Sequence, residues 1–243
     1  GEAFGCGRPD CKVGCDCDRW LEIWNLVFMQ FNRDAGGKLT PLPKPSIDTG
    51  LGLERMVSVL QDVQTNFEID LIVPIIQKTE QLSETRFGGS KAGDVAMKVI
   101  ADHSRAAAFL IGDGVFPSNE GRGYVLRRIM RRAVRYGRNI GLTQPFLHKT
   151  AAVVFDIMRP SYPELIEAKS FITNVIHNEE VRFIETLDTG LKLLNETISE
   201  VKAKGESVIP GHLIFKLYDT YGFPVDIVQD VVREDDIELD MPG

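Results

Sequence analysis

The sequence predicts an α+β fold that is mostly α, and three observations lead to this class. Residues 19–31 are rich in aromatic and branched apolar side chains, over a length suited to a buried strand. Residues 39–47 carry three prolines, so this segment is extended but cannot be a central strand throughout. From about residue 62 onward the apolar residues recur at helical spacing, so we expect a small sheet followed by helices.

Composition limits the domain organisation and the kind of partner. The chain has 243 residues, a net charge of −7 and 43% hydrophobic residues, which is typical of a globular protein. The length suits one large or two ordinary domains. The change of pattern predicts a sheet-containing domain over residues 1–64 and a helical domain over residues 65–243. No apolar run approaches the length of a membrane span, so we expect no membrane partner.

The ends of the chain suggest its cellular setting. The sequence shows no signal-peptide pattern, does not begin with Met and starts inside a motif-bearing region. We therefore expect an internal piece of a longer cytoplasmic protein. The cytoplasm is reducing, so disulfides are not expected among the cysteines.

The cysteines form one cluster in the sequence. All four lie within twelve loop-like residues: Cys6, Cys11, Cys15 and Cys17. Thiolates gather in this way where a structural metal holds a short loop, so a four-thiolate zinc site is one interpretation. The spacing differs from the paired C-x2-C pattern of common zinc modules, and free thiols in a flexible insertion are the other interpretation. The sequence leaves both open.

A glycine-rich turn joins the extended region to the first helix, in the string PSIDTGLGLER at residues 45–55. Gly50 and Gly52 let a ligand lie close to the main chain, and the helix N-terminus that follows directs N–H groups at it. Asp48 and Arg55 bracket the turn with opposite charges, which suits a ligand that has both an amine and a phosphate. From the glycines alone, an ordinary strand-to-helix turn with solvated charges is the favoured interpretation.

One long helix is predicted within residues 164–204. This segment contains no proline, and Gly190 is its one interior break. Its apolar residues recur at alternating spacings of three and four, which is typical of a helix packed along a partner. They are Ile184, Leu187, Leu191, Leu194, Ile198 and Val201.

A strongly basic helix is predicted after residue 118. Between Gly121 and Arg138 it has seven arginines and no acid, and on a helical wheel most of the arginines fall opposite the apolar side. A solvated amphipathic face is one interpretation. We favour phosphate binding, because the helix lacks the acids that would pair with its arginines and because arginine binds phosphate in a bidentate manner. The arginines are Arg122, Arg127, Arg128, Arg131, Arg132, Arg135 and Arg138.

Several strings resemble known enzymes. The string at residues 45–55 resembles motif 3 of the class II aminoacyl-tRNA synthetases, in which an arginine lies on the adenine of ATP and reaches the terminal phosphate. Residues 21–33, 101–103, 117–128 and 217–224 are similar to the alanyl-tRNA synthetase family of that class. The resemblance runs nearly end to end.

The resemblance implies a site for ATP, Mg²⁺ and alanine. Arg55 would stack on adenine and neutralise phosphate, Asp48 would pair with the substrate ammonium, and Gly50 would line the amino-acid pocket. Glu22 and Asn25 would hold Mg²⁺ or the ribose, although a solubilising charge at a strand edge is an equal interpretation for Glu22. The site residues are therefore Glu22, Asn25, Asp48, Gly50, Gly52 and Arg55.

The resemblance also implies a tRNA-reading surface. It assigns Asn119 and Asp219 to a wobble G·U pair in the acceptor stem of tRNA(Ala), although each could simply cap a helix or a turn. The residues expected to hold the RNA backbone beside them are Arg122, Arg127, Arg128, Arg131 and Arg135.

We conclude from the sequence that the chain resembles the end of a class II catalytic domain joined to a helical tRNA-recognition domain. The parent enzyme would activate alanine with ATP and transfer it to tRNA(Ala). Motifs 1 and 2 of the class have no counterpart here, so the piece alone is not expected to form the adenylate. A non-catalytic RNA-binding protein is the alternative, and a helical scaffold that binds a protein partner is a third.

Overall fold

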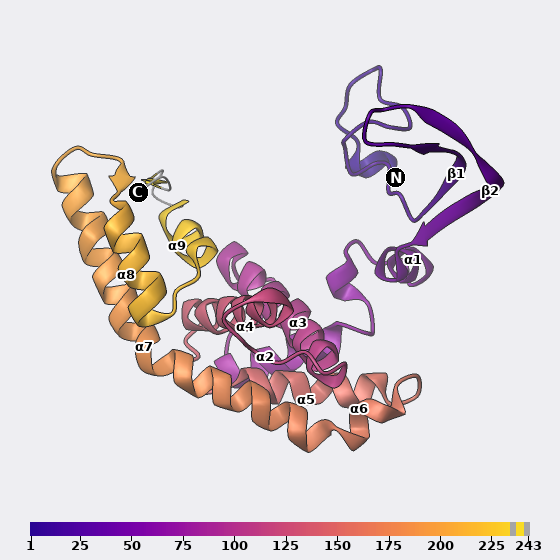
Figure 1. Cartoon of the computed structure of the whole chain (residues 1–243). Helices are drawn as coiled ribbons and strands as arrows, with labels where there is room; N and C mark the ends of the chain where they lie inside the picture. Colours follow the sequence, from indigo (N-terminus) through magenta and orange to yellow (C-terminus); the bar gives the residue numbers. More distant parts are fainter. Residues whose placement is uncertain (234–236, 241–243) are drawn as a thin grey trace. The chain divides into compact units, whose positions relative to one another are not determined.

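The computed structural model describes residues 1–233 and 237–240 (Figure 1). Contacts divide the chain into two compact units, Gly1–Asp70 and Leu71–Gly243. The α+β, mostly α fold class is confirmed, because a small antiparallel sheet is followed by a series of helices. The division at residue 64 that the sequence suggests remains a prediction about domains.

The first unit is built around a β-hairpin. Its elements are η1 (Glu2–Phe4), β1 (Trp24–Arg33), β2 (Leu39–Leu51), α1 (Leu53–Leu60) and η2 (Asn66–Glu68). The two strands are antiparallel, and their register places Asn25 opposite Gly50 and Val27 opposite Asp48. A bulge lies between Met29 and Phe31. Because side chains alternate along a strand, Asn25, Gly50 and Asp48 share one face of the hairpin.

The expectation of a buried strand is wrong for β1. The strand overlaps the predicted segment 19–31 but runs from Trp24 to Arg33, and every one of its residues is exposed. The reason is that two strands alone cover neither face of a sheet, and no third strand pairs with the hairpin in the described part of the chain. The prolines of β2 are tolerated because a two-stranded sheet consists of edge strands only.

The second unit is helical, with one short parallel strand pair. Its elements are α2 (Val73–Ser83), α3 (Lys91–Gly112), α4 (Gly121–Asn139), α5 (Leu147–Met158), α6 (Pro163–Glu167), α7 (Lys169–Ala203), β3 (Val208–Ile209), α8 (Gly211–Tyr221), α9 (Val225–Val232) and β4 (Glu238–Leu239). Helix α3 packs against α2, α4 and α5, and α7 packs against α4, α5 and α8. Within the described residues, no helix has both the length and the apolar character that crossing a membrane requires.

The core of this unit lies around α3. Met97 and Ile100 of α3, Leu126 of α4 and Phe155 of α5 are completely buried. Burying side chains of this size stabilises the fold by about 1.5–3 kcal/mol each. The helices are therefore held together by a shared apolar interior.

The long helix is confirmed as α7, with the short α6 before it. Four of the six residues of the predicted apolar seam are buried, whereas Ile184 and Leu191 are partly exposed. The partner along the C-terminal half of α7 is α8, which lies beside it (Figure 1). Gly190 does not break the helix. A Cβ atom at this position would lie 2.4 Å from Cε2 of Phe223, so the missing side chain lets that buried ring rest against α7.

We expect Gly190→Ala to destabilise the second unit. Alanine improves helix propensity by about 1 kcal/mol, but overpacking a well-packed core costs about 1–3 kcal/mol. The ring of Phe223 has no room to move because it is fully buried, so the clash dominates. Urea unfolding followed by far-UV circular dichroism should show a net loss in the free energy of unfolding. Asn195→Ala, on the exposed side of the same helix, is the control and should be neutral or stabilising. An equal gain in both variants would contradict the packing role of Gly190.

Candidate functional site

A cavity of about 360 Å³ lies where the start of α4, the middle of α7 and the end of α8 meet. Asn119 and Asp219 both line it, and both are exposed to solvent. The structure thus brings together the two polar residues that the sequence resemblance linked, although they are far apart along the chain. The remaining lining residues are Tyr124, Arg127, Arg131, Arg182, Thr186, Tyr218, Thr220, Tyr221, Gly222 and Pro224.

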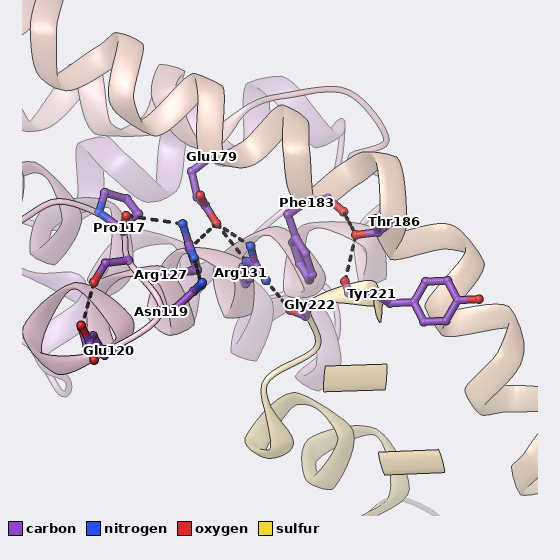
Figure 2. A network of polar contacts seen from close by, with 11 residues as sticks. Pro117, Asn119, Glu120, Arg127, Arg131, Glu179, Phe183, Thr186, Tyr221 and Gly222 are labelled. Atoms are coloured by element: carbon purple, nitrogen blue, oxygen red, sulfur yellow. Dashed lines mark hydrogen bonds and ion pairs between the residues drawn. The ribbon is translucent and has the colours of Figure 1, made fainter. Parts of the chain in front are cut away.

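Two of the lining residues, Arg127 and Arg131, belong to a cluster of charged groups around the buried Glu179 (Figure 2). Arg131 donates from Nε and Nη2 to Oε1 of Glu179, at 3.0 and 2.8 Å, and from Nη1 to the carbonyl oxygen of Gly222 at 2.5 Å. Nε of Arg127 lies 3.0 Å from the same carboxylate oxygen. The side chain of Glu179 is only 4% exposed. Burial lowers the pKa of Arg131, and the Glu179 carboxylate opposes that shift.

Asn119 is oriented by this cluster. Arg127 donates from Nη1 to Oδ1 of Asn119 and from Nη2 to the carbonyl oxygen of Pro117 (Figure 2). The amide oxygen of Asn119 thus has an internal partner, which leaves its Nδ2 group as the donor available to a ligand. The capping alternative for Asn119 is wrong, because the N-cap of α4 is Glu120 and no side chain caps it.

Asp219 lies within the last turns of α8 and is not a cap either. The helix ends at Gly222, whose φ of 67° is the left-handed conformation that glycine adopts readily. The carbonyl group of Gly222 is held by Arg131, so the end of α8 is tied to α4. Asp219 therefore lines the cavity from a helix whose terminus is fixed.

The motif 3 residues meet at the base of the hairpin in the first unit. Arg55 donates from Nη1 to the carbonyl oxygen of Glu22 at 2.8 Å. Asn25 donates from Nδ2 to Oε1 of Glu22 at 3.1 Å. A Cβ atom at Gly50 would lie 3.3 Å from Oδ1 of Asn25, so a side chain there would crowd the amide. Gly52 lies close to the side chain of Arg55. A Cβ atom at position 52 would lie 3.2 Å from Cδ of Arg55, so a side chain there would crowd the arginine.

This arrangement offers hard oxygen ligands beside a cation. The Glu22 carboxylate and the Asn25 amide oxygen are the ligand types that Mg²⁺ prefers, so they fit the expected ion. Asp48 lies on the same face of the hairpin as Gly50, two residues before it in β2. Arg55, at the start of α1, adds a positive guanidinium to the negative carboxylates of Glu22 and Asp48.

The four cysteines form one cluster in space. Their sulfur atoms all lie within 4.8 Å of one another, and all four thiols are free. Arg8 donates to the sulfurs of Cys6 and Cys15 at 3.3 and 3.1 Å. The hydrogen bonds that Cys6 receives from Arg8 lower the pKa of Cys6 to about 6, which favours the thiolate. The cluster can hold a metal ion.

Comparison with known proteins gives the family. A family model described as "tRNA synthetases class II (A)" matches residues 1–243. The chain belongs to this family. The match covers both units.

Similar proteins in this family carry the name alanine–tRNA ligase. The chain is 69% identical over 243 residues to the protein of Desulfosudis oleivorans and 55% identical over 244 residues to that of Nitratidesulfovibrio vulgaris. It is 54% identical over 245 residues to the protein of Geobacillus kaustophilus. Each alignment covers 100% of this chain and 28% of the relative. The chain thus spans little more than a quarter of the length of these relatives.

The expectation of a solvent-facing arginine helix is wrong for Arg131 and Arg135. Arg131 is bound to Glu179 and Gly222, and Arg135 is only 6% exposed, with its guanidinium 4.9 Å from the ring centroid of Tyr136. Elsewhere on the helix, Arg132 pairs with Asp230 at 3.0 Å, and Arg138 pairs with Asp188 at 3.1 Å. The acids that α4 itself lacks are supplied by α7 and α9.

Sequence reasoning missed Glu179, which organises the cavity wall. A signal was present, because two acids, Glu179 and Glu180, lie between Ile176 and Phe183, where the buried side of α7 calls for apolar residues. A buried acid at such a position must have a cationic partner. Of the predicted backbone-binding arginines, Arg122 is exposed, and Arg128 lies with its guanidinium 6.0 Å from the ring centroid of Tyr124.

We expect Glu179→Ala to lower the free energy of unfolding by about 3–5 kcal/mol, because it leaves two largely buried guanidinium groups without their carboxylate. Urea denaturation is the measurement. Asp188→Ala is the matched control on the same helix, since the Asp188 side chain is 71% exposed and its ion pair with Arg138 is worth about 1 kcal/mol or less. Equal losses in the two variants would contradict a central role for Glu179.

Proposed function

We propose that this chain is part of an alanine–tRNA ligase, in which it supplies motif 3 of the nucleotide site and the surface that reads the tRNA(Ala) acceptor stem. The main support is that Asn119 and Asp219, which come from distant segments, line one cavity. The names of the relatives agree with this proposal. They do not favour the alternative of a non-catalytic RNA-binding protein.

In the first step of this reaction, the carboxylate of alanine attacks the α-phosphate of ATP, and pyrophosphate leaves. The protein supplies position and charge rather than covalent chemistry. Arg55 neutralises phosphate and stacks on adenine through its planar cation, and Asp48 holds the substrate ammonium. Gly50 lines the small pocket for the methyl group.

The cofactors of the proposed enzyme are ATP and Mg²⁺. Glu22 and Asn25 would hold the Mg²⁺ ion, which supplies charge neutralisation at the phosphates when it is bound. One carboxylate oxygen of Glu22 accepts from the Asn25 amide, which leaves the other for a ligand. The thiols of Cys6, Cys11, Cys15 and Cys17 would hold a structural Zn²⁺. The location we propose is the cytoplasm.

The reading of RNA follows from the donors and acceptors that the cavity presents. A-form RNA exposes base edges in its shallow minor groove, and a G·U pair leaves the guanine 2-amino group there without its usual partner. The Asp219 carboxylate accepts from that amino group. The Nδ2 group of Asn119 donates to a base oxygen or ring nitrogen beside it, since its Oδ1 is already bound to Arg127.

We expect Asp219→Ala to remove discrimination between G·U and G·C stems more than it removes affinity. The loss should be about 1–3 kcal/mol on the G·U stem and much smaller on the G·C stem. Fluorescence anisotropy with two RNA stems that differ only in that pair is the measurement.

Arg122→Glu is the matched comparison, because Arg122 is exposed and lies at the start of α4 close to Asn119 in the chain. This variant should weaken binding to both stems alike and reduce the dependence of affinity on salt. If Asp219→Ala weakened both stems equally, the assignment of Asp219 to the base pair would be wrong.

The ligase part of the proposal has its own test. In a protein extended to the length of the relatives, Arg55→Ala should lower kcat/KM for alanine-dependent ATP–pyrophosphate exchange about 100-fold or more, since a positioned cation at the reacting phosphates is lost. Arg55→Lys should recover only part of this, because lysine retains the charge but cannot stack on adenine. Arg33→Ala, at the far end of β1, is the control. Unchanged exchange in Arg55→Ala would refute the nucleotide role.

A further inference from the structure

The four-cysteine cluster has the dimensions of a tetrahedral metal site. A zinc–thiolate bond is about 2.3 Å long, so two sulfurs of a tetrahedral Zn²⁺ site lie about 3.8 Å apart. The sulfurs of Cys6 and Cys15 are 3.8 Å apart, and those of Cys11 and Cys17 are 3.6 Å apart. All remaining pairs lie within 4.8 Å, so the site needs only a small contraction to close on an ion.

The segment that carries the thiols has no apolar core of its own. None of residues 1–22 is buried, and the short η1 is its one regular element. Two turns place the thiols, and each is closed by one backbone hydrogen bond. The Cys11 N–H donates to the carbonyl of Arg8, and the Cys15 N–H donates to the carbonyl of Lys12. Ordering such a segment costs about 1–2 kcal/mol per residue in backbone entropy. A bound metal supplies the free energy that the missing core does not.

The charges around the cluster also suit a metal ion bound by four thiolates. Four thiolates around Zn²⁺ carry a net charge of −2, which a nearby cation stabilises. Arg8 provides that cation, because its guanidinium donates to the sulfurs of two different cysteines. Hydrogen bonds of this kind to ligating atoms orient the ligands of metal sites.

The cluster is linked to the motif 3 arginine through a short stretch of backbone. The chain leaves Cys17 with a turn in which the Trp20 N–H donates to the Cys17 carbonyl. It then reaches Glu22, whose carbonyl oxygen accepts from Arg55 at 2.8 Å. The next carbonyl, of Ile23, accepts from the Gly52 N–H at 3.0 Å. Whatever fixes this stretch also fixes the two carbonyl groups that hold the Gly52–Arg55 turn.

We propose that Cys6, Cys11, Cys15 and Cys17 bind one Zn²⁺ ion as thiolates, and that this ion positions Arg55 by ordering the segment that ends at Glu22. Arg55 is then held by a metal-anchored carbonyl group rather than by a packed core. The part that concerns Arg55 rests on the proposed nucleotide site, whereas the metal site stands on the cysteine geometry alone.

The metal site is tested on the whole chain purified without chelator. Elemental analysis should find one zinc per chain, and replacement by Co²⁺ should give the intense absorption of a tetrahedral thiolate complex. Cys11→Ser with Cys17→Ser should abolish both signals. Asp16→Asn, an exposed carboxylate in the same loop, is the control and should retain them. A metal-free chain that carries two disulfides or four free thiols would overturn the site.

The positioning role is tested without substituting any residue. Removal of zinc by a chelator should raise hydrogen exchange severalfold at the Cys15 and Gly52 amides and leave the amides of α7 unchanged. Unchanged exchange at Gly52 in the metal-free chain would overturn the positioning role, even if zinc binds. This readout uses no ATP and no RNA. A failure of the nucleotide or tRNA assignments therefore shows in the Arg55 and Asp219 variants, and a failure of this inference shows in the metal content or the exchange.

Discussion

The buried carboxylate of Glu179 is the contact on which the cavity lined by Asn119 and Asp219 depends. It binds Arg131 and lies against Arg127, and each arginine reaches onward to a different side of the cavity. Arg127 holds the amide of Asn119, while Arg131 holds the carbonyl of Gly222 just beyond Asp219. One side chain on α7 thus fixes the spacing of two groups that come from α8 and from the segment before α4. Removal of a charge from water is unfavourable, so the cluster persists only because each member has its partners.

Arginine suits this cluster better than lysine would. Its planar group donates in several directions at once, so Arg131 can bind a carboxylate and a backbone carbonyl together. The ring of Phe183 lies 5.1 Å from the same guanidinium and shields it from water. The positive charge of α4 is therefore mostly used inside the protein. Among the arginines of α4, the exposed one is Arg122, at the start of the helix, and the exposed Arg182 of α7 lines the cavity.

The sequence predicts the local structure well and the tertiary pairing of charges poorly. The long helix, the strand at β1 and the strand-to-helix turn at Gly52 all follow from patterns within a few residues, and the structure confirms them. The burial of Arg135 could not be read from a helical wheel, because the acids that pair with α4 lie on α7 and α9. The exposure of β1 has the same origin. Apolar alternation predicts a strand, whereas its burial depends on neighbours that the strand itself does not specify.

The close approach of Phe223 to Gly190 has a consequence for the cavity that Asp219 lines. The ring rests on bare backbone, and the residue before it, Gly222, ends the helix that carries Asp219. The carbonyl group of Gly222 also accepts a hydrogen bond from Arg131, so the end of α8 is held from two sides. Neither Gly190 nor Phe223 lines the cavity, yet a methyl group at position 190 would meet the ring that follows Gly222 directly. A substitution outside the cavity would therefore act on the segment that carries Asp219.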